Sequence, residues 1–296
     1  MIVGIETGGT KVVCAVAEKD LSKSPQIVDR FPTTSPDETL RRISDFIADT
    51  TGPAGPEAIG IASFGPLNLD ENSPRYGRLL TTPKAGWSGA DIIGPFSRRF
   101  GAPIALMTDV TGALHAESSH GAARDQRDVA YVTVGTGIGA GLLVDGQVVS
   151  GTGYPEVGHV PVRRHPHDDF AGVCRLHKDC LEGLASGPAI ESRWGADLPR
   201  LAGDTLQAAV NLEAFYVGQL LGTLFYTLGI RVFVVGGGVA NWPGLRDKIK
   251  ASANTAIVGA EGLSVDTMPL AVLPPRLGGL AGVSGALSAA AALVTR

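Results

Sequence analysis

One plan occurs twice in the sequence: an apolar strand runs into a glycine turn that contains a threonine, and a second apolar strand follows directly. Residues 3–18 (VGIETGGTKVVCAVAE) and residues 132–146 (VTVGTGIGAGLLVDG) both follow it. The first segment predicts a β-hairpin, and Asp145-Gly146 predicts a tight hairpin turn beyond the second glycine turn. No linker-like segment separates the two halves of the sequence. The simplest arrangement is therefore two domains around a cleft, with one glycine turn of each domain facing the cleft.

Helical segments alternate with the predicted strands. Residues 37–50 carry apolar side chains at helical spacing, and residues 111–123 predict a second helix. The other expected strands cover residues 57–65, 103–110, 128–135 and 231–241. This alternation predicts an α/β fold. A chain of 296 residues that is 44% hydrophobic is long enough for one large core or two ordinary ones.

Charge and cysteine content exclude several classes of protein. The net charge of −4 implies no general attraction to nucleic acid or to an anionic membrane. Three cysteines are too few for a disulfide framework, which favours a reducing compartment. The N-terminal MIVGIETGGTK lacks the features of a signal peptide. The uncharged run from residue 280 is short for a membrane span and predicts a buried helix. We expect a cytoplasmic protein.

Three glycine turns stand at predicted strand ends: ETGGTK (6–11), GTGIGAG (135–141) and GGGVAN (236–241). Glycine lets backbone N–H groups approach a phosphate closely, although a single such turn is most often only a turn. The three together, with two threonines and Lys11, favour nucleotide binding. The sequence contains neither G-x-x-x-x-G-K-[ST] nor G-x-S-x-G, which excludes a Walker-type phosphate loop and the common hydrolase elbow.

The second turn also matches a looser dinucleotide fingerprint, Gly135-x-Gly137-x-x-Ala140, with Glu156 downstream. The match supplies an alternative function, that of an NAD(P)-dependent sugar dehydrogenase. Such a fingerprint has to open a helix, whereas here the glycines lead into a predicted hairpin. The context therefore argues against the dehydrogenase.

Asp109 ends the strand predicted within residues 103–110 and precedes a predicted helix. One interpretation is a helix N-cap or first-turn acid. The other is a general base, because a hydroxyl that accepts a phosphoryl group has to lose its proton as it attacks. Both interpretations can hold for the same carboxylate.

Cys174, His177 and Cys180 lie within seven residues and offer three ligands that suit zinc. Three candidates for a fourth ligand lie upstream: His159, His165 and His167. In a reducing compartment such spacing is more typical of a metal site than of free thiols. Cys14 lies inside an apolar strand and is interpreted as a core residue.

Two acids lie close to this predicted metal loop. Glu156 and His159 are three residues apart, on one face if that segment is helical, and Glu182 follows shortly after Cys180. Acids beside a phosphate cleft can bind sugar hydroxyls, whereas exposed glutamates are usually only solvated.

These motifs together carry a family resemblance. The chain resembles the ROK family of sugar kinases, and within it the bacterial fructokinase branch. The matches cover nearly the whole length in the same order: GIETGGTK, GIASFGPL, TTPKAGW, TDVTGALHAE, VTVGTGIGAGLLVDG, EVGH, CRLHKDCLEGLASGPAI, VVGGGVAN and PPRLGGLAGVSGAL. EVGH together with CLEGLASGPAI is highly specific, and the glycine turns are less so.

The resemblance implies an actin-like ATPase (ribonuclease H-like) fold of two domains around a cleft. We expect a smaller domain of residues 1–112 with 283–296, closed by the C-terminal helix, and a larger domain of residues 113–282 with a zinc-bearing sugar loop. The resemblance also assigns the nucleotide site, with two phosphate loops and an adenosine contact: Gly8, Gly9, Thr10, Lys11; Gly135, Thr136, Gly137; Gly236, Gly237, Gly238.

The resemblance further implies that Asp109 is the catalytic base and that Thr108 beside it contacts the substrate. Glu156, His159 and Glu182 match the sugar contacts of the family. His159 also matches a zinc ligand of the family, which makes it the fourth ligand. The full set is then His159, Cys174, His177 and Cys180.

The sequence departs from the family pattern at a few positions. Glu6 stands where most members have Asp, and Cys-x2-His-x2-Cys replaces the usual Cys-x-Cys-x4-Cys; both departures resemble the fructokinase branch. Thr108 and Thr111 stand where the family has Asn on either side of its base. Thr108 fits the branch, and Thr111 has no such match.

We therefore expect an ATP-dependent hexose kinase that converts D-fructose to fructose 6-phosphate, with Mg²⁺ and a structural Zn²⁺. Mannose or glucose as the acceptor, the dehydrogenase, and a sugar sensor without catalysis are the alternatives. The expected partners are the hexose and ATP, with no nucleic acid and no membrane, and the expected assembly is a homodimer.

Overall fold

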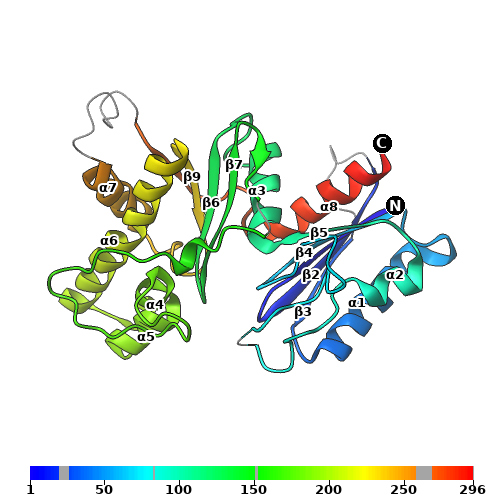
Figure 1. Cartoon of the computed structure of the whole chain (residues 1–296), viewed down its shortest axis with the longest axis horizontal. Coiled ribbons are helices and arrows are strands. Elements are labelled where there is room, and N and C mark those ends of the chain that lie inside the picture. The colour runs from blue at the N-terminus through cyan, green and yellow to red at the C-terminus, as the bar shows by residue number, and fades with distance from the viewer. Residues whose placement is uncertain (20–26, 83, 151–152, 258–268, 296) are drawn as a thin grey trace. The chain divides into compact units, whose positions relative to one another are not determined.

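The computed structural model describes residues 1–19, 27–82, 84–150, 153–257 and 269–295. The chain forms two compact units (Figure 1). Unit 1 contains Met1–Ala116, Ser150–Tyr154 and Gly279–Arg296, and unit 2 contains Glu117–Val149 and Pro155–Gly278.

These limits differ from the expected domains, which ended at residue 112, resumed at 283 and kept residues 150–154 in the larger domain. Tyr154 shows why the last segment lies with unit 1. Its hydroxyl accepts a hydrogen bond from the Leu67 backbone N–H, at 2.5 Å.

Unit 1 is built on a five-stranded sheet with the order β3-β2-β1-β4-β5. The strands are β1 Ile2–Thr7, β2 Lys11–Ala17, β3 Ile27–Pro32, β4 Ala58–Ser63 and β5 Ile104–Thr108. β1 and β2 pair antiparallel, which confirms the predicted hairpin, while β1, β4 and β5 are parallel. Thr7, Ser63 and Thr108 are in register, so the first glycine turn and Asp109 leave the sheet at the same edge.

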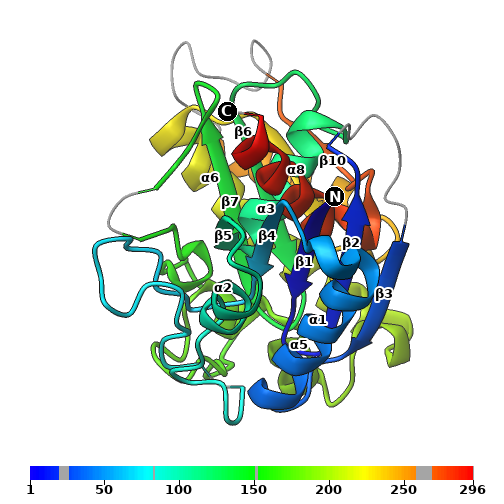
Figure 2. The same cartoon turned by 90° about the vertical axis from the view of Figure 1, so that its right-hand side faces the viewer.

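Helices cover both faces of this sheet (Figures 1 and 2). Because side chains alternate along a strand, Val3 and Ile5 of β1 pack with α1, and Ile2 packs with α8. The predicted C-terminal helix is confirmed as α8. The helices of this unit are α1 Pro36–Thr51, η1 Gly52–Ala54, α2 Gly94–Phe100 and α8 Ala281–Val294; α3 Asp109–Ser119 and η4 Gly278–Leu280 run across the unit limits.

Gly60 sets the distance between α8 and the sheet. A Cβ at Gly60 would lie 1.8 Å from the Ala286 carbonyl oxygen, so α8 would have to move away from β4. We expect Gly60→Ala to lower the free energy of unfolding by about 1–3 kcal/mol, which is the usual cost of overpacking a core. Thermal unfolding followed by circular dichroism would measure the change.

Gly153→Ala is the matched control, because a Cβ at Gly153 meets no atom within 4 Å. An unchanged melting temperature for Gly60→Ala would contradict the tight contact between α8 and β4.

Unit 2 has a sheet of the same plan, with the order β10-β9-β6-β7-β8. β6 and β7 pair antiparallel across the second glycine turn, and β6 and β9 are parallel. The strands are β6 Val129–Val134, β7 Ile138–Val144, β8 Gln147–Val148, β9 Val232–Gly236 and β10 Ala271–Leu273. In both sheets a central strand therefore has an antiparallel hairpin partner on one side and a parallel partner on the other. The strand, glycine turn and second strand of the repeated sequence plan are present in both.

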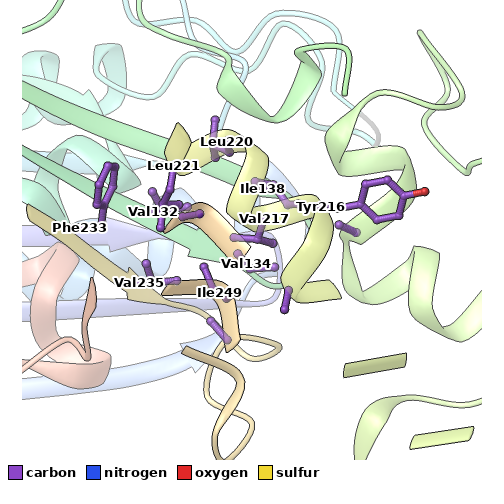
Figure 3. Packing of buried hydrophobic residues seen from close by; sticks show 14 of the residues in the cluster. Val132, Val134, Ile138, Tyr216, Val217, Leu220, Leu221, Phe233, Val235 and Ile249 are labelled. Carbon is purple, nitrogen blue, oxygen red and sulfur yellow. The ribbon is translucent and has the colours of Figure 1, made fainter. Parts of the chain in front are cut away.

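The core of unit 2 lies between this sheet and two long helices, α6 Gly203–Leu228 and α7 Leu245–Ile257. Figure 3 shows Val132 of β6, Phe233 of β9, Leu221 of α6 and Ile249 of α7 within this buried cluster. The shorter helices are η2 Val157–His159, α4 Leu181–Ala185, α5 Gly187–Trp194 and η3 Leu198–Arg200.

Two local expectations need correction. The strand expected to end at Asp109 ends at Thr108, and Asp109 is the first residue of α3. The segment with Glu156 and His159 is not one helical face, because Glu156 precedes the short 3₁₀ helix η2.

Cys14 is fully buried in the core of unit 1, and burial raises the pKa of its thiol. The interpretation of Cys14 as a core residue is confirmed. Among the residues that the structure describes, no helix combines the length and the apolar character needed to cross a membrane.

Candidate active site

The first glycine turn joins β1 to β2 in unit 1. The Gly8 N–H donates to the Lys11 carbonyl at 2.8 Å and closes the turn, and Gly9 and Thr10 lie at its tip. A Cβ at Gly9 would meet no atom within 4 Å, so one side of the turn is open.

Glu6 lies at the end of β1 and faces the start of α8. Its carboxylate accepts a hydrogen bond from the Val283 N–H at 3.2 Å, and a Cβ at Gly282 would lie 2.5 Å from the Glu6 carboxyl carbon. Burial raises the pKa of Glu6, and the nearby charge of Lys11 opposes the rise. Glu6 thus ties the strand before the first glycine turn to the C-terminal helix.

Asp109 begins α3 at the edge of the sheet where the first glycine turn also lies. Thr108 makes the bond typical of a helix N-cap: its Oγ1 accepts from the Thr111 N–H at 3.2 Å. Its hydroxyl also lies 2.8 Å from that of Thr111. Thr111, which had no match in the resemblance, therefore contributes to the same cap. The Asp109 carboxylate accepts from the adjacent Val110 N–H at 2.8 Å.

The second and third glycine turns lie together in unit 2. Gly135 follows β6 and Gly237 follows β9, and these parallel strands end at the same edge of the sheet. Gly237 has φ +97°, and a Cβ there would lie 2.3 Å from the Val134 carbonyl oxygen, so this position requires glycine. The Val239 N–H donates to the Val134 carbonyl at 3.0 Å and holds the third turn against β6.

A pocket with a volume of about 350 Å³ opens beside these two turns. Its size is at the lower end of the range for small-molecule sites, roughly 300–1,000 Å³. The walls are mainly apolar or glycine, and the only charged residue among them is Asp197. The lining residues are Gly135, Thr136, Gly187, Ile190, Asp197, Leu198, Pro199, Gly238, Val239 and Trp242.

Glu182 contacts the second glycine turn. Its Oε2 accepts a hydrogen bond from the Ile138 N–H at 2.9 Å, and a Cβ at Gly137 would lie 2.7 Å from the same oxygen. The EVGH segment (156–159) also packs closely against the start of β7, because a Cβ at Gly158 would lie 2.0 Å from the Ile138 carbonyl oxygen. The structure thus brings Glu182 and the EVGH segment to the start of β7.

The four expected metal ligands lie together in unit 2. Within the described residues, His159, Cys174, His177 and Cys180 each offer one ligand atom, and all four atoms lie within 4.8 Å of one another. His159 Nδ1 is 3.7 Å from Cys174 Sγ and 3.6 Å from Cys180 Sγ. Tetrahedral zinc with its usual bond lengths of about 2.0–2.3 Å separates its ligands by roughly 3.3–3.8 Å. The donor set and the two His159–cysteine distances fit Zn²⁺.

The loop that carries Cys174, His177 and Cys180 has a tightly constrained backbone. Cys174 and Lys178 exchange two backbone hydrogen bonds, of 3.2 and 2.9 Å, and Lys178 has φ +59°. Cβ atoms at Gly172 and Gly183 would lie 2.1 and 1.8 Å from the Lys178 carbonyl oxygen, so both positions require glycine. Burial is the main reason that the pKa of the Cys180 thiol is raised to about 11, so a bound metal has to displace its proton.

The other two histidines considered as ligands lie elsewhere. The His165 ring packs edge-on against Phe215, with centroids 5.0 Å apart, and its other ring neighbour is His167 at 5.6 Å.

Several residues of these sites carried no signal in the sequence. Asp197, Leu198, Pro199 and Trp242 line the pocket from segments with no recognisable motif. Thr33 and Lys84 contact the first glycine turn, and only the family-like segment TTPKAGW could have drawn attention to Lys84.

Comparison with known proteins places the chain in a family. Residues 2–293 match the profile of the ROK family. The chain is 39% identical to the fructokinase of Zymomonas mobilis, over 97% of this chain and 95% of the relative. It is 36% identical to the fructokinase of Pediococcus pentosaceus, over 97% and 96%. The crystal structure of the ROK hexokinase from Thermus thermophilus matches with a TM-score of 0.81 at 27% identity and covers 99% of both chains.

The protein has two mixed sheets with the same strand arrangement, and helices pack on each sheet. It is therefore an α/β protein with the actin-like ATPase fold. The chain belongs to the ROK family.

Proposed function

We propose that this chain is an ATP-dependent hexose kinase that phosphorylates the 6-hydroxyl of D-fructose. The observation that carries the proposal is the similarity to fructokinases at 36–39% identity over 97% of the chain. The pocket at two glycine turns supports a nucleotide as cosubstrate.

In this proposal the adenosine of ATP occupies the pocket of unit 2, beside Gly135–Gly137 and Gly236–Gly238. The apolar walls suit a purine base, and Asp197 can accept a hydrogen bond from a ribose hydroxyl. Gly8, Gly9, Thr10 and Lys11 contact phosphates through backbone N–H groups and the lysine charge. Mg²⁺, bound with ATP, neutralises part of the phosphate charge.

Asp109 is the proposed general base. Its carboxylate takes the proton of the fructose 6-hydroxyl, whose oxygen attacks the γ-phosphorus while the bond to the β-phosphate oxygen breaks and ADP leaves. Thr108 is proposed as a contact of the substrate. Because Thr108 also makes the cap of α3, it holds the start of the helix on which the base lies.

Glu156, His159 and Glu182 are the proposed contacts of the sugar hydroxyls. Glu182 is fixed by the Ile138 N–H, so its carboxylate is held in one place. His159, Cys174, His177 and Cys180 are proposed to hold a structural Zn²⁺, which would fix the loop that carries His159. The proposal also includes a homodimer in the cytoplasm that binds no nucleic acid.

The dehydrogenase alternative is disfavoured by the segment that follows Gly135 and Gly137. A dinucleotide fingerprint has to open a helix, whereas here β7 begins at Ile138 and forms a hairpin with β6.

A coupled assay of ADP formation across a panel of hexoses tests the proposed function. We expect the highest kcat/KM with fructose, ahead of mannose, glucose and an N-acetylated hexosamine, because a sugar whose hydroxyl groups lie at other positions leaves polar groups of the site unpaired at about 1–3 kcal/mol each. Phosphorus NMR of the product should show the 6-phosphate.

The panel separates the alternatives. A higher kcat/KM with another hexose would reject fructose and keep the kinase. A lack of ADP formation with every sugar, together with sugar binding in calorimetry, would instead favour a sensor.

A further inference from the structure

We propose that Lys84 and Thr33 are positioning residues of the kinase reaction: they hold two consecutive carbonyls of the first glycine turn, so that the Gly9 and Thr10 N–H groups face a phosphate of ATP. This inference rests on the proposed function. It concerns unit 1 alone, where all of these residues lie.

The contacts to the turn come from two separate segments. The Thr33 hydroxyl donates to the Gly8 carbonyl at 2.7 Å. The Lys84 ammonium donates to the Gly9 carbonyl at 2.5 Å and to the Thr33 carbonyl at 3.1 Å. The Thr33 N–H also donates to the Thr10 carbonyl at 3.0 Å, so Thr33 binds the turn on both sides of Gly9.

The geometry of the peptide bond determines where the Gly9 and Thr10 N–H groups point once these carbonyls are held. In a trans peptide the carbonyl of one residue and the N–H of the next point in opposite directions. With the Gly8 carbonyl bound to Thr33, the Gly9 N–H points away from Thr33. With the Gly9 carbonyl bound to Lys84, the Thr10 N–H points away from Lys84.

The two N–H groups are available for a ligand. Neither donates a hydrogen bond to another residue in the part of the chain that the structure describes. The space beside Gly9 is open, as a Cβ there would meet nothing within 4 Å. Successive N–H groups of a turn form a small concave anion site, and an ammonium bound to the carbonyl of the same peptide strengthens its N–H as a donor.

Lys84 is held for this contact by a buried tryptophan three residues later. Trp87 is fully buried, its Nε1 donates to the Thr34 carbonyl at 2.8 Å, and its ring packs edge-on against Phe64 with centroids 5.3 Å apart. The Trp87 N–H also donates to the Lys84 carbonyl at 3.1 Å. These contacts fix the backbone from which the lysine side chain reaches the turn, so its two bonds require little further ordering of the backbone.

The test compares Lys84→Met and Thr33→Val with the wild-type enzyme. Both replacements keep the approximate shape of the side chain and remove its donor. A hydrogen bond to a charged group is worth enough that losing one changes binding by about 10-fold to 100-fold. We expect Lys84→Met to lower kcat/KM for ATP by that factor. Thr33→Val should lower it by about 2-fold to 10-fold, because the bond of Thr33 to the Gly8 carbonyl joins neutral groups. In both variants the fructose KM and the inhibition constant of adenosine should change less than about two-fold, because neither fructose nor adenosine carries a phosphate.

Lys19→Met is the matched control for the loss of one lysine charge. Lys19 lies in the same unit and makes an exposed ion pair with Glu57, at 2.5 Å. This variant should keep the wild-type kcat/KM for ATP. Lys84→Arg, which keeps the charge and a donor, should recover part of the activity lost in Lys84→Met.

The outcomes distinguish the inference from the proposed function. A wild-type protein that forms no ADP with any hexose rejects the function. An active wild type with unchanged kcat/KM for ATP in both variants rejects the inference alone. A loss in Lys84→Met without any loss in Thr33→Val also overturns it, because the lysine would then act by direct charge. Parallel losses for ATP, adenosine and fructose would indicate general unfolding and overturn it too.

Discussion

Asp109→Asn is expected to lower kcat for fructose phosphorylation by at least about two orders of magnitude, because a positioned general base contributes roughly 10²–10⁴-fold and an amide cannot take the proton. The KM for ATP should change little, since only the proton acceptor is lost. Steady-state kinetics with fructose and ATP would measure both.

The local structure indicates that Asp109→Asn should remove the base without disturbing the fold around it. Asn keeps an oxygen that can accept from the Val110 N–H, which lies 2.8 Å from the Asp109 carboxylate. Thr108 makes a cap bond of α3 that the substitution leaves in place, so the helix start should survive. The melting temperature should therefore stay close to that of the wild type.

Asp37→Asn is the matched control. Asp37 is an exposed acid in the first turn of α1, in the same unit, and its loss removes only a favourable interaction with the helix dipole. It should keep the wild-type kcat. A kcat above a tenth of the wild-type value in Asp109→Asn would show that another group is the base and that Asp109 is only a helix-start acid.

Purified protein is expected to contain about one zinc per chain, and Cys174→Ala or Cys180→Ala is expected to lose it. Structural zinc binds isolated peptides with roughly 10–16 kcal/mol, and this energy contributes to folding. The loss should therefore lower both the melting temperature and the activity, and it should expose residues 156–182 to proteolysis. Elemental analysis by mass spectrometry, thermal unfolding and limited proteolysis would measure the three effects.

Two controls separate metal loss from general damage. Cys14→Ala removes a buried thiol from the core of unit 1 and should keep one zinc per chain. His167→Ala removes a histidine that lies outside the cluster and should also keep the metal. A metal-free preparation with full activity and an unchanged melting temperature would reject the structural zinc.

Several features follow from the sequence alone because they depend on near neighbours. The apolar runs on either side of Gly8-Gly9 predicted one antiparallel hairpin, and Asp145-Gly146 predicted a tight hairpin turn; both are present. The strand-to-helix junction at Asp109 was predicted to within one residue. The spacing of Cys174, His177 and Cys180 was sufficient to propose a metal.

Other elements escaped the sequence analysis for a physical reason. The helix α6 is buried over much of its length, so it lacks the one-sided apolar pattern that marks a surface helix. The strand β3 lies at the edge of its sheet and has only one buried residue, so its residues do not alternate clearly between apolar and polar. In neither case did the local pattern indicate what surrounds the segment.

The sequence by itself determined the hairpins, the glycine turns and the residue types that can act as base and metal ligands. Only the tertiary structure decided which distant residues meet. The parallel pairing of β6 with β9 puts Gly135 and Gly237 at one edge of the sheet. Packing of the loop with Glu182 against Ile138 and of the loop with Lys84 against Gly9 joins segments 44 and 75 residues apart. Such contacts depend on the register of strands and the close packing of remote segments, which no short stretch of sequence encodes.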